Sequence, residues 1–418
     1  MRELFPPTPL QHNLTLSNRY GAEIWLKRED LSPVRSYKIR GALNAMSALL
    51  ASGVKGPFVC ASAGNHAQGV AFAARHFGVK AVVFMPVTTP DQKVRRTATF
   101  GGPNVRIELT GDYFDESQAA ARAYTEQEGG VFLPPFDSEL VMAGQASVGV
   151  EIMDDLGSAP DAIVVGVGGG GLSAGLTSFF QASGAATEFW LVEPDGARSL
   201  QAALAAGAPR TLDSVDNFVD GASVARVGDN TFRVLAAQPL ERTLGVPENR
   251  VCSTMLSMLD TEGMVLEPAG ALTIDVLADL FRLHGDKMRG KRVVCITSGG
   301  NFDFERLPDV KERALRWEGR KKYFILRMPQ RPGALRDFLD LLGPEDDITR
   351  FEYLKKSARN FGSVLIGLEA KAGGSELNAA GGAPAPADSF KKLADRVSAA
   401  GFQFRDITDD PVLAEFLI

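Results

Sequence analysis

The sequence is poor in the residue types that bind metals and cross-link small domains. Its 418 residues include only three cysteines, Cys60, Cys252 and Cys295, which lie far apart within apolar runs and form no C-x-x-C pair. The four histidines form no H-E-x-x-H or similar pair. We therefore expect buried free thiols instead of a disulfide framework or a zinc site. A metal-dependent hydrolase is disfavoured for the same reason.

The sequence also lacks an excess of positive charge and a long hydrophobic run. The formal net charge is -6 at pH 7, so the chain has no electrostatic footprint for nucleic acid. No apolar stretch approaches the roughly 20 residues of a membrane span, and the first residues carry no hydrophobic secretion segment. We expect a cytoplasmic protein that binds neither nucleic acid nor a membrane. Its length allows two or three domains.

Four consecutive glycines, Gly168 to Gly171, follow an apolar, β-branched run at residues 162–167. Leu172 and the residues after it have helical character, so the pattern predicts a strand, a glycine loop and a helix N-terminus. Such a loop leaves backbone N–H groups free to converge, and the helix dipole favours an anion, so we expect a phosphate there. A turn without a ligand is the weaker alternative, because adjacent glycines are costly in backbone entropy.

The loop alone does not identify the phosphate ligand. Gly166, Gly168 and Gly171 also match the dinucleotide fingerprint G-x-G-x-x-G, and Glu193 ends the next expected strand at roughly the spacing of a ribose-binding acid. Taken by itself, this motif favours a nicotinamide-dependent oxidoreductase. Its position deep in the chain and the additional glycine argue against that interpretation. The choice between cofactors therefore depends on the rest of the chain.

A lysine lies where an amphipathic helix is expected to begin. The segment Ser36 to Ala42 leads into a helix whose apolar face carries Leu43, Met46, Leu49 and Leu50. Lys38 lies in or just before its first turn, where the helix dipole disfavours a cation. Its amine therefore either extends to solvent or is kept neutral for a chemical purpose. On the residues alone, the solvent interpretation is favoured.

Two further loops follow expected strands. Ser62 and Asn65 lie in a small-residue loop that could hold an anion, and His66 enters a helix of small residues, where we expect a structural or orienting role. Ser298 follows the last buried strand, at residues 293–296. Because ligands bind beyond the carboxyl ends of parallel strands, we expect the loops at Ser62, Gly168 and Ser298 to face one cleft. Residues 55–145 are predicted to form a small inserted α/β subdomain.

The last quarter of the chain has a different pattern. Residues 318–322 are predicted to be a basic linker, which divides a domain at residues 1–319 from one at residues 320–418. From residue 323 the order of expected elements is β-α-β-β-α-β, as in a ferredoxin-like sandwich. The stretch from Gly373 to Asp388, rich in Ala, Gly and Pro, is predicted to be a disordered loop.

Together these motifs resemble the biosynthetic threonine ammonia-lyases (threonine dehydratases) in their short form with one ACT-like regulatory module. The likeness runs from Thr8 to the C-terminal module, and Tyr37 replaces the phenylalanine usual beside the lysine. The motifs that carry it are Ser36–Ala42, Ser62–His66, Gly168–Leu172, Ser298–Asn301 and Arg331–Leu335. The resemblance implies an α/β, fold type II pyridoxal-phosphate enzyme with two open parallel-sheet subdomains, followed by an α+β ferredoxin-like ACT-like domain. The resemblance makes the alternative of a dinucleotide-binding oxidoreductase much weaker.

The resemblance also implies roles for individual residues. Lys38 would form the Schiff base with pyridoxal 5'-phosphate, and a lysine near a helix N-terminus has its pKa lowered, which favours the nucleophilic amine. The cofactor phosphate would be held by Gly168, Gly169, Gly170, Gly171 and Leu172. Asn65 would bind its phenolic oxygen and Ser298 its pyridine nitrogen, which a hydroxyl leaves neutral, so that β-elimination outruns racemisation. The substrate carboxylate would be held by Ser62, Ala63, Gly64 and Asn65.

The implied reaction is deamination of L-threonine to 2-oxobutanoate and ammonia, the first committed step of isoleucine biosynthesis. L-serine should be a slower substrate, because one methyl group in an apolar pocket is worth only ~1–3 kcal/mol. A serine dehydratase or racemase is the alternative on the same scaffold. Racemases of this kind carry serine where this chain has Ala63, and a methyl group cannot transfer a proton.

The remaining implications concern regulation and assembly. Isoleucine would inhibit the enzyme, and valine would oppose this inhibition. Both would bind at the turn formed by Arg331, Pro332, Gly333, Ala334 and Leu335. A potassium ion would be held by Glu193, the carbonyl of Ala197 and Ser199, although a purely capping role for Glu193 stays equally open. The resemblance implies a homotetramer.

Overall fold

The computed structural model describes residues 4–343, 346–354, 360–370 and 388–410. The chain divides into two compact units, Met1–Asp303 and Phe304–Ile418. The second unit therefore begins before residue 319 and includes helix α13 (Leu307–Trp317). Glu312 on this helix pairs with Lys321 and accepts a hydrogen bond of 2.8 Å from the hydroxyl of Tyr323. Lys321 and Lys322, predicted to be linker, already belong to a strand.

The first unit contains a six-stranded sheet with the order β1-β2-β10-β7-β8-β9. Its strands are β1 (Leu10–His12), β2 (Glu23–Arg28), β7 (Ala162–Gly166), β8 (Glu188–Pro194), β9 (Thr243–Val246) and β10 (Arg292–Thr297). All neighbours are parallel except β1 and β2. Strands β7, β8 and β10 match the strands expected before the glycine loop, at Glu193 and before Ser298. The short strands β1 and β9 carry no comparable signal and were not predicted.

Helices cover both faces of this sheet. Ile163, Val165 and Leu191 share a core with residues of α6 and α7, whereas α11 contacts β7 and β10. The helices are α1 (Leu14–Tyr20), α2 (Lys38–Ala51), α6 (Glu139–Leu156), α7 (Gly171–Ala182), α8 (Ser199–Ala206), α9 (Asp229–Leu235), α10 (Glu248–Glu262), α11 (Pro268–Asp275) and α12 (Leu277–Met288). Helices α11 and α12 meet at Val276. Short 3-10 turns lie at η1 (Glu29–Leu31), η2 (Gly102–Asn104), η3 (Asp195–Ala197), η4 (Leu240–Arg242) and η5 (Phe304–Arg306).

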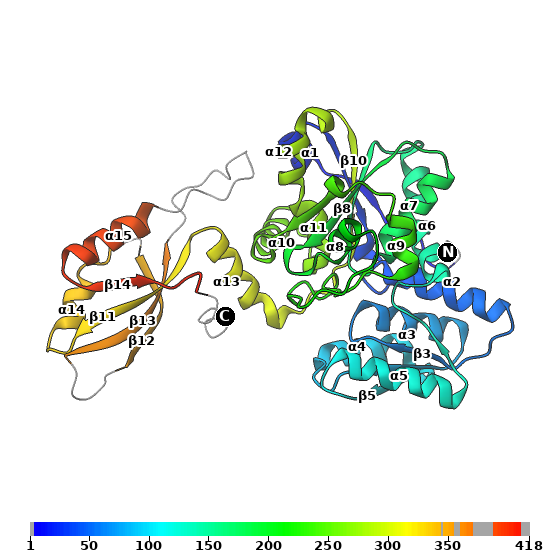
Figure 1. Cartoon of the computed structure of the whole chain (residues 1–418), viewed down its shortest axis with the longest axis horizontal. Helices are drawn as coiled ribbons and strands as arrows, with labels where there is room; N and C mark the ends of the chain where they lie inside the picture. Colours follow the sequence, from blue (N-terminus) through cyan, green and yellow to red (C-terminus); the bar gives the residue numbers. More distant parts are fainter. Residues whose placement is uncertain (1–3, 344–345, 355–359, 371–387, 411–418) are drawn as a thin grey trace. The chain divides into compact units, whose positions relative to one another are not determined.

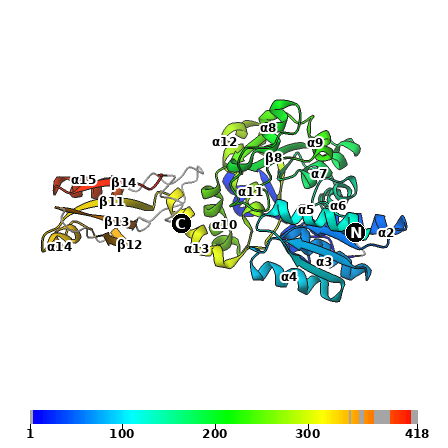
Figure 2. The ribbon, with the colours of Figure 1, turned by 60° about the horizontal axis from the view of Figure 1, so that its bottom comes forward.

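A second, smaller parallel sheet has the order β5-β4-β3-β6 and is inserted in sequence between β2 and β7 (Figure 1). Its strands are β3 (Phe58–Ala61), β4 (Ala81–Met85), β5 (Val105–Leu109) and β6 (Val131–Phe132). Side chains alternate along each strand, so Cys60 packs toward α2 and α3, whereas Val59 packs toward α5. Figure 2 shows α5 (Phe114–Glu128) on one side of the strands and α3 (Asn65–Phe77) and α4 (Asp91–Gly101) on the other.

The second unit has the predicted ferredoxin-like order. Its elements are β11 (Lys321–Pro329), α14 (Ala334–Leu339), β12 (Asp346–Leu354), β13 (Phe361–Ala370), α15 (Asp388–Ala399) and β14 (Gln403–Asp406). The antiparallel sheet runs β12-β13-β11-β14. Phe338 of α14 and Leu393 of α15 join one core with Leu326, so both helices pack on the same face. The predicted loop of residues 373–388 lies outside the described residues, except Asp388.

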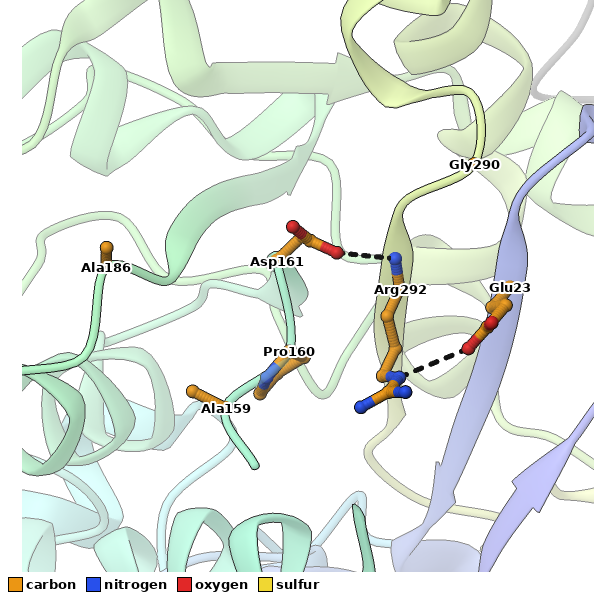
Figure 3. A pocket seen from close by; sticks show the side chains of 7 residues that line it. All are labelled: Glu23, Ala159, Pro160, Asp161, Ala186, Gly290 and Arg292. Atoms are coloured by element: carbon orange, nitrogen blue, oxygen red, sulfur yellow. Dashed lines mark hydrogen bonds and ion pairs between the residues drawn. The ribbon is translucent and has the colours of Figure 1, made fainter. Parts of the chain in front are cut away.

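The carboxyl and amino ends of the larger sheet differ in character. At the amino ends of β2, β7 and β10, a surface depression is lined by Glu23, Asp161 and Arg292 (Figure 3). These charges are satisfied by one another, because Arg292 contacts Glu23 at 3.1 Å and donates its backbone N–H to Asp161 at 2.9 Å. At the carboxyl ends lie the glycine loop and Ser298. All three cysteines are buried, and none of the described helices is long and apolar enough to cross a membrane.

Candidate active site

Lys38 is the first residue of α2, and its amine is held inside the first unit. Nζ donates a hydrogen bond of 2.9 Å to the carbonyl of Pro135 and lies 5.3 Å and 5.9 Å from the ring centres of Tyr37 and Phe136. Burial lowers the pKa of Lys38 from 10.5 to about 8, against the opposing charge of Glu267. The solvent interpretation of this lysine is therefore wrong, since the amine is held by the loop before α6.

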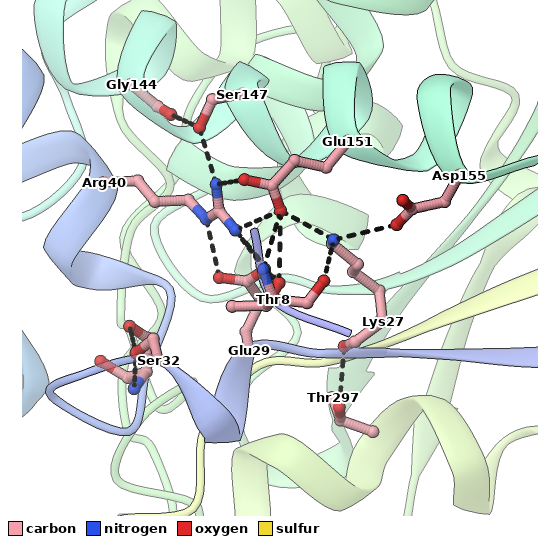
Figure 4. Close-up of polar contacts among 11 residues, drawn as sticks. Thr8, Lys27, Glu29, Ser32, Arg40, Gly144, Ser147, Glu151, Asp155 and Thr297 are labelled. Atoms are coloured by element: carbon pink, nitrogen blue, oxygen red, sulfur yellow. Dashed lines mark hydrogen bonds and ion pairs between the residues drawn. The ribbon is translucent and has the colours of Figure 1, made fainter. Parts of the chain in front are cut away.

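A buried charged cluster fixes the first turn of α2 (Figure 4). The fully buried guanidinium of Arg40 donates to Glu29 at 2.8 Å and to Glu151 at 2.6 Å. Lys27 pairs with the same Glu151 at 2.7 Å and donates to the carbonyl of Thr8 at 2.6 Å. These contacts join α2 to strand β2 and helix α6. Because Arg40 follows Lys38 by two positions in the sequence, the cluster restrains the backbone from which Lys38 projects.

The glycine loop forms a close-fitting cradle between β7 and α7. A side chain at Gly169 would overlap the ring of Phe136, and one at Gly171 would come within 2.9 Å of the same residue. Gly170 has a φ of 90°, in the left-handed region that favours glycine. Among the described residues we find no acceptor for the backbone N–H groups of residues 168–172. Unpaired N–H groups at the N-terminus of α7 fit a phosphate.

Asn65, the first residue of α3, is held on both sides of its amide. Its Nδ2 donates to the carboxylate of Glu267 at 2.8 and 3.0 Å, and its Oδ1 accepts a hydrogen bond of 2.7 Å from Asn301. Arg96 of α4 donates at 2.9 Å to the amide oxygen of Asn301. This network joins the two halves of the first unit, because α3 and α4 pack on the smaller sheet.

Glu267 was not identified by the sequence analysis. The residue is only 6% exposed, and burial raises the pKa of its carboxyl to about 7, assisted by the charge of Asp220. It also lies against Gly299, where a side chain would overlap its carboxylate. The one available signal was an acidic residue, followed by Pro268, between apolar residues. Its proximity to Asn65 could not be read from that pattern.

Ser298 lies beside the segment that carries Lys38. Its carbonyl accepts a hydrogen bond of 3.1 Å from the backbone N–H of Tyr37, and Ser36 forms a backbone bridge with Gly299. The three predicted loops are thus brought together: the Ser62 loop through Asn65 and Asn301, the Ser298 loop through Tyr37, and the glycine loop through Phe136. Each follows the carboxyl end of a parallel strand, as expected.

The loop from Ser62 to Gly64 precedes α3, with Ala63 at its centre and half-buried. Gly64 donates its N–H to the hydroxyl of Ser62 at 3.2 Å, which shapes the turn. His66, in the first turn of α3, is buried and contacts the carbonyl of Leu133 through Nε2 at 2.9 Å. Burial and the charge of Lys38 lower the pKa of His66 to about 3, so its ring is neutral. This geometry agrees with a structural or orienting role.

Glu193 is fully buried and caps helix α8. Its two carboxylate oxygens accept the backbone N–H groups of Leu200 and Gln201 at 2.7 and 2.9 Å, while burial raises its pKa to about 7. Because both oxygens already cap α8 and the side chain is fully buried, the geometry argues against the use of Glu193 to bind a ribose. The hydroxyl of Ser199 is buried and has no hydrogen-bond partner among the described residues.

The predicted effector turn lies in the second unit between β11 and α14. Gly333 adopts a φ of 83° and precedes α14, which has only six residues. Arg331 is exposed and pairs with Asp337 at 2.6 Å. A ligand carboxylate that bound Arg331 would therefore replace the carboxylate of Asp337.

Comparison with known protein families agrees with this geometry. Residues 1–299 match the family described as "Pyridoxal-phosphate dependent enzyme", and residues 312–379 match "C-terminal regulatory domain of Threonine dehydratase". The cofactor fits the residues present, which offer an amine of lowered pKa, a loop of unpaired backbone N–H groups and an oriented amide. These are the groups from Lys38, the glycine loop and Asn65.

Similar proteins point to the same family. The chain is 41% identical over 419 residues to the biosynthetic L-threonine dehydratase of Halalkalibacterium halodurans, covering 100% of this chain and 96% of the relative. It is 47% identical to that of Bacillus subtilis, covering 87% of this chain and 85% of the relative. The processed form of threonine deaminase isoform 2 from Solanum lycopersicum is 36% identical, with a TM-score of 0.68, covering 74% of this chain and 88% of that structure. The chain therefore belongs to the pyridoxal-phosphate-dependent biosynthetic threonine dehydratases.

Proposed function

We propose that this dehydratase converts L-threonine to 2-oxobutanoate and ammonia in the cytoplasm, as the first committed step of isoleucine biosynthesis. The observation that carries the proposal is the amine of Lys38, whose pKa burial lowers to about 8, near a loop of unpaired N–H groups. A lysine of this kind is the nucleophile needed by an enzyme that uses pyridoxal phosphate.

The chain's residues divide the binding of the cofactor among them. The N–H groups of residues 168–172 and the dipole of α7 bind the phosphate, the amide of Asn65 binds the phenolic oxygen, and the hydroxyl of Ser298 binds the ring nitrogen. When bound, pyridoxal phosphate supplies an electron sink for the charge that develops at the substrate Cα. Because Ser298 is a hydroxyl and not a carboxylate, it leaves the ring nitrogen neutral, which favours prompt elimination.

The reaction requires a base and a site for the carboxylate. The N-terminus of α3, with Ser62, Ala63, Gly64 and Asn65, binds the substrate carboxylate. The amine of Lys38 takes the Cα proton, and the β-hydroxyl leaves with the electrons of its C–O bond; the proton taken by Lys38 balances this hydroxide, so that one molecule of water is eliminated overall. The released enamine hydrolyses to 2-oxobutanoate and ammonia.

A comparison of substrates tests this assignment. We expect 2-oxobutanoate from L-threonine, and pyruvate from L-serine at a lower kcat/KM, since the lost methyl contact is worth only ~1–3 kcal/mol. The measurement is the initial rate of 2-oxo acid formation over a range of each substrate. A higher kcat/KM for L-serine would overturn the assignment to threonine.

We also propose that the second unit binds isoleucine as an inhibitor, with valine opposing it, at the turn Arg331, Pro332, Gly333, Ala334 and Leu335. The match to a threonine dehydratase regulatory domain supports a regulatory role for this unit. The exposed guanidinium of Arg331, which pairs with the half-exposed Asp337 and donates a long hydrogen bond to the Pro332 carbonyl, can receive an amino-acid carboxylate.

A potassium ion bound by Glu193, the Ala197 carbonyl and Ser199 completes the proposal, together with a homotetrameric assembly. The unpartnered, buried hydroxyl of Ser199 supports the cation, whereas the helix-capping contacts of Glu193 occupy part of its capacity. Activity that is equal in sodium and potassium buffers would leave Glu193 with its capping role alone. A tetramer is tested by light scattering of the purified protein.

A further inference from the structure

The N-terminus of α9 contacts the glycine loop at the carbonyl of Gly169. The hydroxyl of Thr231 donates a hydrogen bond of 2.7 Å to the carbonyl of Gly169, and the backbone N–H of Gly228 approaches the same oxygen at 3.3 Å. Thr231 has no exposed area, and a side chain at Gly170 would come within 2.9 Å of its hydroxyl. This contact fixes the orientation of the peptide group between Gly169 and Gly170, in a loop whose consecutive glycines have high backbone freedom.

Peptide geometry carries the effect of this bond to the next residue. The C=O and N–H of one trans peptide point in opposite directions, so a carbonyl of Gly169 turned toward Thr231 turns the N–H of Gly170 the other way. The following carbonyl, of Gly170, is likewise held, by the backbone N–H of Ala174 at 2.8 Å and the hydroxyl of Ser173 at 3.1 Å. The first contact therefore turns the N–H of Gly170 away from α9, and the second turns the N–H of Gly171 away from the body of α7.

A second contact holds α9 in place. The carboxylate of Asp137 accepts the backbone N–H groups of Asp229, Asn230 and Thr231 at 3.1, 2.8 and 3.2 Å. The residue before it, Phe136, is the one whose ring packs on Gly169. The loop is thus held by residues 136–137 and residues 228–231, which come from separate parts of the chain.

We propose that Thr231 is a positioning residue for the cofactor phosphate, which it orients through the Gly169 peptide without touching the ligand. Glycine has more backbone freedom than any other residue, so four adjacent glycines would present their N–H groups poorly without an external restraint. Each N–H that points correctly makes a charge-assisted hydrogen bond to the phosphate. The proposal rests on the assignment of the glycine loop to that phosphate.

The test compares two ligands that differ only in the phosphate. Dissociation constants of pyridoxal phosphate and of pyridoxal are measured by absorbance with the cofactor-free full-length chain and its variants. Thr231→Val removes the hydroxyl and keeps the side-chain shape, whereas Thr231→Ser retains a hydroxyl. We expect Thr231→Val to weaken pyridoxal phosphate binding about tenfold or more, since one oriented N–H is lost, and to leave pyridoxal binding within about twofold. Thr231→Ser should recover most of the loss.

A control variant and the other outcomes keep the test decisive. Thr177 on α7 has a buried hydroxyl with no hydrogen-bond partner among the described residues, so Thr177→Val should bind both ligands as the wild type does. Thr231→Ala replaces the valine variant should that one fail to fold. Equal weakening of both ligands, or no weakening of either, would overturn the role of Thr231. A wild-type protein that bound pyridoxal as tightly as pyridoxal phosphate would instead overturn the phosphate assignment itself.

Discussion

The side-chain amide of Asn65 faces the carboxylate of Glu267, with its nitrogen 2.8 Å and 3.0 Å from the two carboxylate oxygens. An ionised carboxylate can only accept hydrogen bonds, so it holds the nitrogen of the amide toward itself. On the other side, Asn301 donates to the amide oxygen. Both ends of Asn65 are therefore set before a cofactor arrives, and this setting depends on the ionisation of Glu267.

The first prediction follows from the pKa of Glu267, which burial raises to about 7. Above this pH the carboxylate accepts from Asn65, and below it the acid is protonated and the restraint weakens. We expect kcat/KM for threonine to fall as pH falls through about 7, which gives an acid limb in the pH profile. The Glu267→Gln variant should lack this acid limb. Asp220→Asn should move the limb to lower pH, because the charge of Asp220 raises the same pKa. An unchanged limb in Glu267→Gln would contradict the prediction.

The second prediction concerns Lys38. Its pKa of about 8 means that the neutral amine increases as pH rises through that value, instead of near 10.5. The cofactor-free protein should bind pyridoxal phosphate at a rate that rises as pH increases through about 8 and then becomes constant. This rate is measured from the growth of the visible absorbance band. Lys38→Ala should abolish turnover and still bind the cofactor through its phosphate. A rate that rises only above pH 10 would show that the amine is not perturbed.

The third prediction concerns the buried cluster around Arg40. Arg40→Met leaves Glu29 and Glu151 with too little compensating charge, so we expect the free energy of unfolding to fall by about 3–5 kcal/mol. The matched control is Arg95→Ala on α4, which removes an exposed pair with Asp91 whose side chains are 79% and 85% exposed. That change should cost less than about 1 kcal/mol. Urea unfolding of both variants measures the difference, and equal losses would count against the cluster.

The fourth prediction concerns the stereochemical outcome. Ala63 lies in the loop before α3 and offers a methyl group where a racemase needs a proton donor. Chiral chromatography of the reaction with L-threonine or L-serine should therefore detect 2-oxo acid and no D-amino acid. D-threonine or D-serine formed alongside the oxo acid would contradict this expectation.

The fifth prediction separates regulation from catalysis. Arg331→Ala should lose inhibition by isoleucine and keep its activity, because the residue lies in the second unit. Arg327→Ala is the matched control, since Arg327 is an exposed arginine of the neighbouring strand β11, and it should remain sensitive. A chain ending at residue 303 should also be active and insensitive. If all three variants respond to isoleucine like the wild type, the effector acts elsewhere.

Local sequence patterns predicted the parts of the site that are local in structure. The apolar run before Gly168 and the helical residues after it form one continuous strand, loop and helix, so composition alone places the cradle. The same holds for Ser62 and Ser298, which follow their own strands. The ferredoxin-like order of the second unit was also predictable, because each element has its own hydrophobic period.

Contacts across long sequence separations were not predictable. Asn65 and Glu267 are 202 positions apart, and Lys38 meets Pro135 across 97. The solvent interpretation of Lys38 failed for this reason, since its burial depends on a loop far away in the chain. The helix-dipole argument considers only the end of one helix. It cannot predict which distant segment of the chain packs over that end.

Strand β10 is the last strand of the larger sheet to be synthesised, yet it lies between β2 and β7. A nascent chain shorter than about residue 297 therefore holds two strands whose facing edges are unpaired, and exposed edges promote pairing with other chains. The first unit cannot complete its larger sheet until β10, close to the C-terminal end of this unit, has left the ribosome. Premature termination before β10 should thus give aggregation-prone fragments without cofactor affinity, whereas a chain stopped after Asp303 has all the strands of this unit.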